Sequence, residues 1–524
     1  MTSIQAHRAA DGDPFAAARE AFDDATQWLR ADAQNSTHAD VERGLRKRGF
    51  EIMRRLEQGH LDLRLAIERV ALARDGKPDG VEVRERERDL EGLFGEVKVR
   101  RHGFKEPEKA ARFPMDEALN LPAERYSLPL RQGVAEEARD GSWDRAVERV
   151  DATTGGHVPK RQAEQLTVRA AQDFDAFYAE RPAPANDQLS DLALLVMSSD
   201  GKGVRMLPQA LREATRKEAA AAAAEAVHGD PMAPKKTRRH DKRMAVVTAV
   251  WEQERHTRTP DEVIANLRPA HERKAANKGK PVPRPQQKRL NASVEDSLNV
   301  GIAKMFDEAD RRDPGRDRAA IVLLDGQQSQ LTAVNDEARK RGRTIEIILD
   351  LIHAIHYLWL AGLVLCRKDE GETERWTIDH LGQSLGCVGV HGVIAAMRAT
   401  ADASGLSKKA LKPVEKCISY FTDNAAYMGY FSLISRGMPI ATGVIEGACR
   451  YLVQDRMGRT GARWSLSGAE AILRLRALRT SGDFDAYWQF HLAQDHRRTH
   501  TSRYANGEIP NPLPPTRPRL QLVK

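Results

Sequence analysis

Two short runs rich in β-branched residues and leucine lie in the middle of the chain, and each leads directly into an aspartate. Residues 320–324 (AIVLL) precede Asp325, and residues 344–349 (TIEIIL) precede Asp350, with one amphipathic helix expected between them at 330–341. Such runs are typical of strands buried on both faces, and the spacing predicts a βαβ unit with two parallel strands. Reactive groups in open α/β sheets lie just beyond the carboxyl ends of the strands, so both aspartates are candidates for chemistry.

Three further apolar runs upstream extend the predicted sheet. Residues 192–197 (LALLVM) lead to Asp200, residues 204–207 are expected to form the return strand of a hairpin, and residues 244–251 form a third strand. The predicted order is a three-strand meander, then a parallel strand, a helix and a strand. In a ribonuclease-H-like sheet the first and fourth strands lie side by side, which would bring Asp200 next to Asp325.

A third acid, Glu446, follows a mostly helical stretch. We expect a helical insertion over 367–440 and then a helix over 442–453 that carries Glu446 in its first turns. If this helix packs on the sheet, Glu446 joins Asp200 and Asp325 in one cluster. The alternative is that an Asp-Gly pair after a strand is an ordinary turn and that each acid is an ordinary surface charge.

A cluster of three carboxylates requires cations. Two unit charges about 4 Å apart repel by roughly 4 kcal/mol at an effective dielectric near 20. Three acids together therefore protonate, separate or bind metal. Mg²⁺ suits a site of few carboxylates completed by water and phosphate oxygens. Two Mg²⁺ ions, or Mn²⁺ in their place, can activate a water or a 3′-hydroxyl for displacement at phosphorus.

The first part of the chain is predicted to be mainly helical. Residues 14–75 show 3.6-residue apolar periodicity, and the alternation at 92–101 predicts one arm of a β-hairpin. We expect the helical stretch to serve as scaffold, or as a pairing helix, rather than as a site.

Residues 142–178 have the pattern of a helix-turn-helix. Ser142 is expected to begin the first helix, residues 153–156 (TTGG) to form the turn, and Pro159 to begin the second helix, with Lys160 and Arg161 facing outward. A glycine turn followed by a basic helix is typical of DNA-binding modules of this kind. An ordinary helical hairpin fits the same pattern.

Composition divides the chain into six segments, with the clearest boundary at the proline-containing linker 181–187. The segments are a helical N-terminal region (1–90), a β-hairpin and helix-turn-helix-like DNA-binding region (91–180), an α/β catalytic core with basic loop insertions (181–366), a helical insertion (367–440), the acidic-helix part of that core (441–490) and a poorly ordered tail (491–524). The fold class expected is thus an α/β catalytic domain preceded by a mainly helical DNA-binding region.

Charge is concentrated in a few loops. The 83 Lys and Arg against 75 Asp and Glu give only +8 over 524 residues, so local clusters matter more than the total. Residues 235–243, 274–289 and 455–464 are basic loops, which are either solvated or in contact with phosphates. The side chains expected to bind DNA are Lys160, Arg161, Lys235, Lys236, Arg238, Arg239, Arg456, Arg459, Arg463 and Trp464, the last by stacking on a base.

The compartment expected is the bacterial cytoplasm. The N-terminus lacks the apolar core of a signal peptide, and the longest apolar run, 357–366, is far shorter than the ~20 residues of a membrane helix. The four cysteines show no C-x-x-C spacing, which disfavours a disulfide framework or a zinc ribbon and suits a reducing environment.

Two motifs in the second half of the chain carry a family resemblance. Residues 350–359 (DLIHAIHYLW) match a D-x-x-H-x-x-x-x-L signature. Residues 443–450 (GVIEGACR) and 457–464 (MGRTGARW) are similar to an E-x-x-x-(K/R) helix motif and a following G-x-R-W element. On these residues the chain resembles ISKra-type insertion-sequence transposases, a prokaryotic DDE group related to the Mutator-like transposases. The likeness covers most of 40–490, but residues 102–112 lack the cysteine-rich piece that many relatives carry.

The resemblance implies a ribonuclease-H-like catalytic domain with a metal-binding Asp, Asp, Glu triad. Carried over to this chain, the triad is Asp200, Asp325 and Glu446. Asp350 and His353 are either the alternative second acid with its neighbour or groups that act beside the metal ligands. His353 also fits the pattern of a hydrogen-bonded core histidine.

The function that follows from the resemblance is DNA transposition. The protein is expected to bind the terminal inverted repeats of an insertion sequence, to cleave the DNA ends, and to join the 3′-hydroxyl to target DNA, working as a homodimer or larger assembly. Two alternatives remain open at this point: a ribonuclease-H-like nuclease without strand transfer, and a domesticated DNA-binding regulator that no longer uses its acids.

Overall fold

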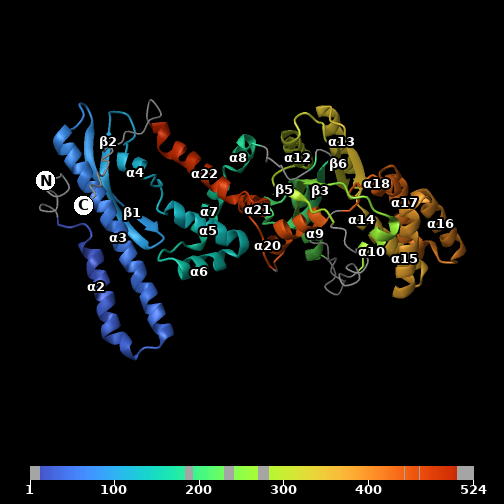
Figure 1. Ribbon diagram of the computed structural model, residues 1–524, viewed down its shortest axis with the longest axis horizontal. Coiled ribbons are helices and arrows are strands. Elements are labelled where there is room, and N and C mark those ends of the chain that lie inside the picture. The colour runs from blue at the N-terminus through green and yellow to red at the C-terminus, as the bar shows by residue number, and fades with distance from the viewer. Residues whose placement is uncertain are drawn as a thin grey trace, which may run out of the picture. The chain divides into compact units, whose positions relative to one another are not determined.

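The computed structural model of the protein describes residues 12–182, 190, 193–228, 241–268, 282–441, 443–459 and 461–503. The chain divides into two compact units. Unit 1 comprises Met1–Ala179 together with Phe484–Lys524, and unit 2 comprises Glu180–Asp483 (Figure 1). The division falls beside the predicted linker, of which residues 183–187 lie outside the described part of the chain.

Unit 1 combines a long helical hairpin, a two-stranded antiparallel sheet and a group of shorter helices. Its main elements are α2 (Ala16–Arg30), α3 (His38–Asp75), β1 (Glu82–Gly92), β2 (Gly95–Lys105), α4 (Pro114–Ala118), α5 (Leu128–Asp140), α6 (Trp143–Thr153), α7 (Lys160–Ala170), α8 (Phe174–Glu180) and α22 (Phe484–Thr499). The pairing of β1 with β2 confirms the hairpin predicted at 92–101.

The helices α5, α6 and α7 surround one small apolar core. Ser142 begins α6 as predicted, because its Oγ accepts a backbone N–H of the first turn at 3.2 Å. The glycine turn lies against the β-hairpin: a Cβ on Gly155 would lie 2.5 Å from the Phe94 carbonyl oxygen, so only glycine fits. The helix predicted to run from Pro159 to 178 is two helices, α7 and α8, separated by residues 171–173.

The predicted tail begins too early. Residues 484–499 form α22, which packs within unit 1, so the stretch from 491 to 503 is structured. Tyr487 Oη donates to the Ala170 carbonyl at 2.6 Å, and Asp173 pairs with His491 and Arg498 at 2.7 and 2.6 Å. The aromatic residues of α22 supply an apolar face that composition alone did not reveal. Residues 504–524 lie outside the described part.

Unit 2 is built on a five-stranded mixed sheet of order β5-β4-β3-β6-β7. The strands are β3 (Leu194–Arg205), β4 (Lys242–Gln253), β5 (Gln286–Ser293), β6 (Ala320–Leu324) and β7 (Glu346–Leu349). β4 runs antiparallel to β3 and β5, whereas β6 runs parallel to β3 and β7. The first and fourth of these strands are therefore neighbours, as predicted. The helix α13 (Gln328–Arg341) joins β6 to β7 and confirms the βαβ unit.

The predicted hairpin between 192–197 and 204–207 is wrong. β3 is one continuous strand that passes through Asp200 and ends at Arg205, paired with β4 along its whole length. The ladder hydrogen bonds from β4 keep this polar, glycine-containing segment extended although it lacks apolar alternation. Asp200 consequently lies within a strand rather than in a turn.

The third strand of the meander is β5, which begins within the last residues of the stretch 274–289 that was predicted as a basic loop. The buried residues Leu290 and Ala292 follow directly after the basic segment and form the apolar half of this strand. Residues 274–281 lie outside the described part.

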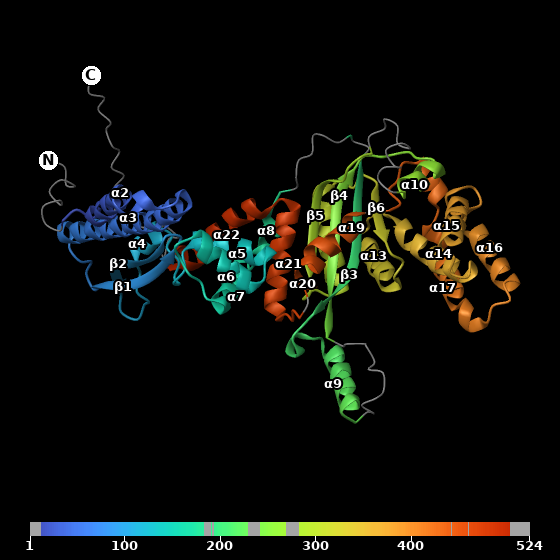
Figure 2. The ribbon, with the colours of Figure 1, turned by 90° about the horizontal axis from the view of Figure 1, so that it is seen from below.

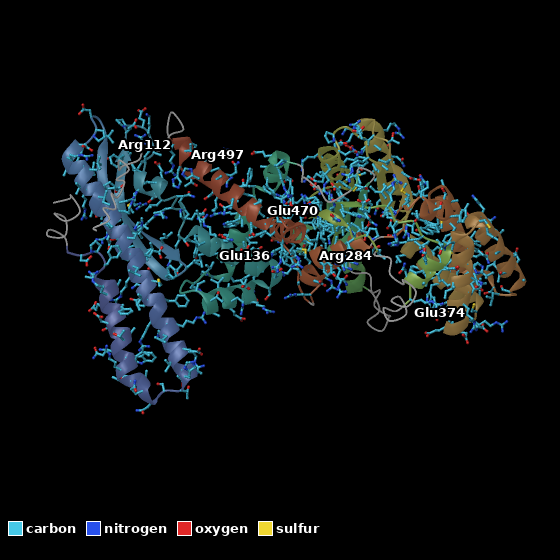
Figure 3. The ribbon with its side chains drawn as sticks, viewed as in Figure 1. Arg112, Glu136, Arg284, Glu374, Glu470 and Arg497 are labelled. Carbon is cyan, nitrogen blue, oxygen red and sulfur yellow. The ribbon has the colours of Figure 1, made fainter. Side chains whose placement is uncertain are left out.

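The two faces of the sheet are covered by different helices. α12 (Leu298–Arg312) and α13 pack on the face that carries Leu195, Met197, Val322 and Leu324. On the other side, α19 (Gly443–Ala448) packs against β3 and β4, and α21 (Leu466–Ser481) packs against β5. Glu470 of α21, labelled in Figure 3, accepts a hydrogen bond from the Val294 N–H at 2.9 Å.

A group of helices inserted between β7 and α19 lies beside the sheet, as Figure 2 shows. They are α14 (Leu351–Leu365), α15 (Glu370–Leu385), α16 (Gly389–Ala403), α17 (Lys408–Asn424) and α18 (Tyr430–Ser435). This region confirms the helical insertion predicted at 367–440. The other elements of unit 2 are η2 (Pro208–Ala210), α9 (Glu213–His228), α10 (Pro260–Asn266), η3 (Ala425–Tyr427), the π-helical turn η4 (Cys449–Gln454) and α20 (Asp455–Met457).

Within the described ranges, the structure contains no helix with the length and apolarity needed to cross a bilayer.

Candidate functional site

The pairing of β3 with β6 brings Asp200 into the region of the sheet where β6 ends and Asp325 follows it. The last paired residues are Ser198 and Leu323, and each aspartate follows two positions later on its own chain segment. Neighbouring strands lie about 4.8 Å apart, so the two aspartates begin on adjacent backbone positions. Because side chains alternate along a strand, Asp200 has the same orientation as Ser198, opposite to Met197, which packs against α12 and α13.

Glu446 reaches the same face from α19. Its carboxylate is largely buried, and neither Oε1 nor Oε2 has a hydrogen-bond partner among the described residues. Burial raises its pKa to about 7, and the negative charges of Asp350 and Asp200 act in the same direction. Its own backbone N–H and the charge of the His353 ring lower the pKa of Glu446. The late helix therefore brings the third predicted acid together with the first.

Asp350 and His353 belong to the same cluster. Asp350 is 3% exposed and begins α14, with one carboxylate oxygen accepting the Ile352 N–H at 2.8 Å. Its backbone N–H donates to the Leu324 carbonyl at 2.8 Å, directly before Asp325. Of the two candidates for the second acid, Asp350 is therefore the one whose charge acts on Glu446, whereas Asp325 adjoins Asp350 through the backbone of Leu324.

Cys449, which is not among the predicted site residues, contacts Asp200. Its thiol donates a hydrogen bond to Asp200 Oδ2 at 3.1 Å, while the Gly201 N–H donates to Oδ1 at 2.6 Å. Burial raises the pKa of this thiol well above its usual range, and the charge of Asp200 adds to the shift. Cys449 begins a π-helical turn, a distortion frequent at functional sites. The signal available in the sequence was its position one helical turn after Glu446.

The donor set suits a hard divalent cation. Glu446 presents two buried oxygens that no described residue satisfies, and further carboxylates adjoin it; oxygen donors of this kind are the ligands of Mg²⁺ and Mn²⁺. In the part of the chain that the structure describes, no three His, Cys, Asp or Glu side chains already stand in metal-binding geometry. Binding would therefore involve adjustment of side-chain rotamers.

Two residues expected to contact DNA are buried. Arg456 and Trp464 are 3% and 4% exposed, and the guanidinium lies 4.5 Å from the centre of the indole ring. The backbone of Trp464 bonds to the extension of β3, donating to the Arg205 carbonyl at 3.1 Å and accepting the Leu207 N–H at 2.8 Å. Their expected role as surface contacts is thus corrected: this pair anchors the glycine- and arginine-rich loop to the sheet.

Other basic side chains of the prediction are exposed. Arg459 and Arg463 extend from the same loop into solvent, and Lys160 and Arg161 are exposed at the start of α7. Lys160 forms an ion pair with Asp144 at 2.7 Å, which reduces the charge it presents. The remaining predicted contacts, Lys235, Lys236, Arg238 and Arg239, lie outside the described residues.

Comparison with known proteins adds no identification. A scan against protein-family models finds no match, and a search of the curated proteins finds none.

Proposed function

We propose that the protein is a DDE transposase whose unit 2 is a ribonuclease-H-like catalytic domain. The observation that carries the proposal is that Glu446 lies close to Asp200 and Asp350, which are far from it in sequence, while Asp325 directly follows the strand paired with β3. The strand order supports it, because adjacency of the first and fourth strands is a feature of ribonuclease-H-like sheets. The motif resemblance at 443–464 points in the same direction.

Asp200, Asp325 and Glu446 would hold the metal ions, with Asp350 beside them. Two bound Mg²⁺ ions supply activation of the attacking oxygen and charge stabilisation on the leaving oxygen at phosphorus. The chain's own contribution is to place Glu446 near other carboxylates where burial disfavours its ionised state, so that cation binding relieves an existing electrostatic cost. Cys449 and the Gly201 N–H fix the orientation of the Asp200 carboxylate.

DNA would be held by both units. In unit 2, Arg459 and Arg463 lie on the loop that Trp464 anchors to β3, in the same segment of chain as Glu446. In unit 1, α6 and α7 present Lys160 and Arg161 as a helix-turn-helix would. The DNA substrates proposed are the terminal inverted repeats of the element and a target duplex, bound by a homodimer or larger assembly.

The test is a cleavage and strand-transfer assay. The purified protein, incubated with Mg²⁺ and duplexes carrying the ends that flank its gene, is expected to nick the ends and to join them to a target plasmid. Chelator is expected to stop both reactions. Cleavage without joining would favour a nuclease, and specific binding without either reaction would favour a DNA-binding regulator.

Replacing Arg459 and Arg463 with glutamine is expected to weaken DNA binding and to reduce its salt dependence. Each phosphate neutralised contributes about 0.9 to the slope of log K against log salt, so the slope should fall by nearly two. Affinity measured by fluorescence anisotropy at several salt concentrations checks this. The matched control is the pair Arg339 and Lys340, exposed on α13 at the opposite face of the sheet, whose substitution should leave the slope unchanged.

Replacing Lys160 and Arg161 with alanine is expected to reduce the preference for element ends over random DNA. A lost base contact costs about 1–3 kcal/mol, or roughly 5- to 150-fold in specificity. Footprinting on an end-containing duplex measures it, with Arg145 of α6 as the control substitution. Unchanged footprints would return α6 and α7 to a purely structural role.

A further inference from the structure

The peptide carbonyls at the ends of β6 and β7 are held by tyrosines of the helical insertion. Tyr420 Oη of α17 donates to the carbonyl oxygen of Asp325 at 2.6 Å. Tyr430 Oη of α18 donates to the carbonyl oxygen of Leu349, immediately before Asp350, at 3.1 Å. A buried backbone carbonyl at a strand end has no ladder partner of its own, so these hydroxyls satisfy groups that the sheet leaves open.

Further contacts fix the same two turns. The N–H of Leu351 donates to the carbonyl of Ile440, at the end of the insertion, at 2.8 Å. Gly326, directly after Asp325, has φ +85°, and a Cβ there would lie 2.9 Å from Asn424 Oδ1 of α17. Asn424 Nδ2 in turn donates to the Tyr420 carbonyl at 2.9 Å. The turn that carries Asp325 therefore packs closely against the last two turns of α17.

The tyrosines are themselves rigidly placed. The Tyr420 ring stacks on Tyr357 of α14, with centroids 3.9 Å apart and planes 19° from parallel. Tyr430 is 1% exposed. Phenylalanine would fill both sites equally well by shape, so packing alone does not account for the hydroxyl groups.

We infer that the helical insertion is a working part of the catalytic site, in which Tyr420 and Tyr430 are positioning residues that set the backbone of the turns bearing Asp325 and Asp350. This inference rests on the proposed function and adds to it a role for α17 and α18. Groups that orient metal ligands through hydrogen bonds typically change metal affinity or activity by 10- to 100-fold when removed. The same consequence is expected here, since the Asp325 turn loses its anchor.

The test compares Tyr420→Phe with Tyr427→Phe. Tyr427 lies in the same insertion, and its hydroxyl has no hydrogen bond to any described residue. Tyr427→Phe therefore controls for the loss of a tyrosine hydroxyl as such. Binding of Mn²⁺ to the metal-free protein is followed by electron paramagnetic resonance, and cleavage is measured against Mg²⁺ concentration. Tyr420→Phe is expected to weaken Mn²⁺ binding about tenfold or more and to move the Mg²⁺ requirement upward by a similar factor.

DNA affinity and the urea midpoint report on folding in the same samples. If Tyr420→Phe unfolds the protein, Tyr430→Phe, which acts on the neighbouring turn, is the second variant, with the same expected shift. Unchanged Mn²⁺ affinity in a folded Tyr420→Phe protein overturns the inference. Glu446→Gln separates this failure from that of the proposed function: if it too leaves Mn²⁺ binding and cleavage unchanged, the metal site itself is wrong.

Discussion

Replacing Glu446 with glutamine is expected to abolish metal-dependent DNA cleavage and, at the same time, to stabilise the metal-free protein at pH 8. Loss of one group that stabilises the transition state costs at least about 10²-fold in rate. The metal-free protein should become more stable, because glutamine has the shape of the protonated acid. It removes the cost of holding an ionised carboxylate that is buried, near Asp350 and Asp200, and without a hydrogen-bond partner among the described residues.

The direction of the predicted change in stability follows from the pKa of Glu446. The pKa of Glu446 is about 7 in the folded chain against a usual 4.5, so the folded state binds the proton more tightly than the unfolded state. The stabilisation is fully present below pH 4.5 and is lost as the pH rises to 7, by about 2 to 3 kcal/mol after allowance for solvent screening. Mg²⁺ should reverse the loss because it binds the ionised form.

Urea denaturation in chelator between pH 5 and 8 measures the effect. The free energy of unfolding of the wild-type protein should fall through this range more steeply than that of Glu446→Gln, and added Mg²⁺ should raise the former at pH 8. Parallel curves for the two proteins would mean that Glu446 is not held in a buried acidic cluster. Glu415 of α17, an exposed glutamate, is the control for a simple change of net charge.

Asp325→Asn and Asp350→Asn are expected to differ strongly. Asp325→Asn should slow cleavage by at least about 10²-fold, because Asp325 directly follows β6, the strand paired with the one that carries Asp200. Asp350→Asn should reduce cleavage by about tenfold or less. Asparagine retains the cap on the Ile352 N–H, since asparagine is as strong a helix N-cap as aspartate.

A second measurement distinguishes the roles of these two aspartates. Burial is the largest cause of the raised pKa of Glu446 and Asp350 is the next, so Asp350→Asn should lower that pKa. The fall in metal-free stability between pH 5 and 8 should then shift to lower pH in Asp350→Asn. Single-turnover cleavage by each variant completes the comparison. If Asp350→Asn is the inactive variant and Asp325→Asn the active one, the second metal ligand is Asp350.

The local elements around the acids were predictable because their periodicity is strong. The apolar runs before Asp325 and Asp350 gave β6 and β7, and the amphipathic segment between them gave α13 within a few residues. The course of β3 through Asp200 was not predictable, because residues 198–203 are polar and glycine-rich. Their extended backbone depends on pairing with β4, which is about fifty residues distant in sequence.

Residue type and short-range periodicity were enough to give the identity and order of the acids and the elements next to Asp325, Asp350 and Glu446. Tertiary structure alone decided which groups meet. It buried Arg456 against Trp464, brought Cys449 to Asp200, and set the hydroxyl of Tyr420 on the carbonyl of Asp325. These contacts join positions about 100 to 250 residues apart or depend on burial. A local pattern of hydrophobic and polar residues predicts neither long-range pairing nor the electrostatic cost of burial.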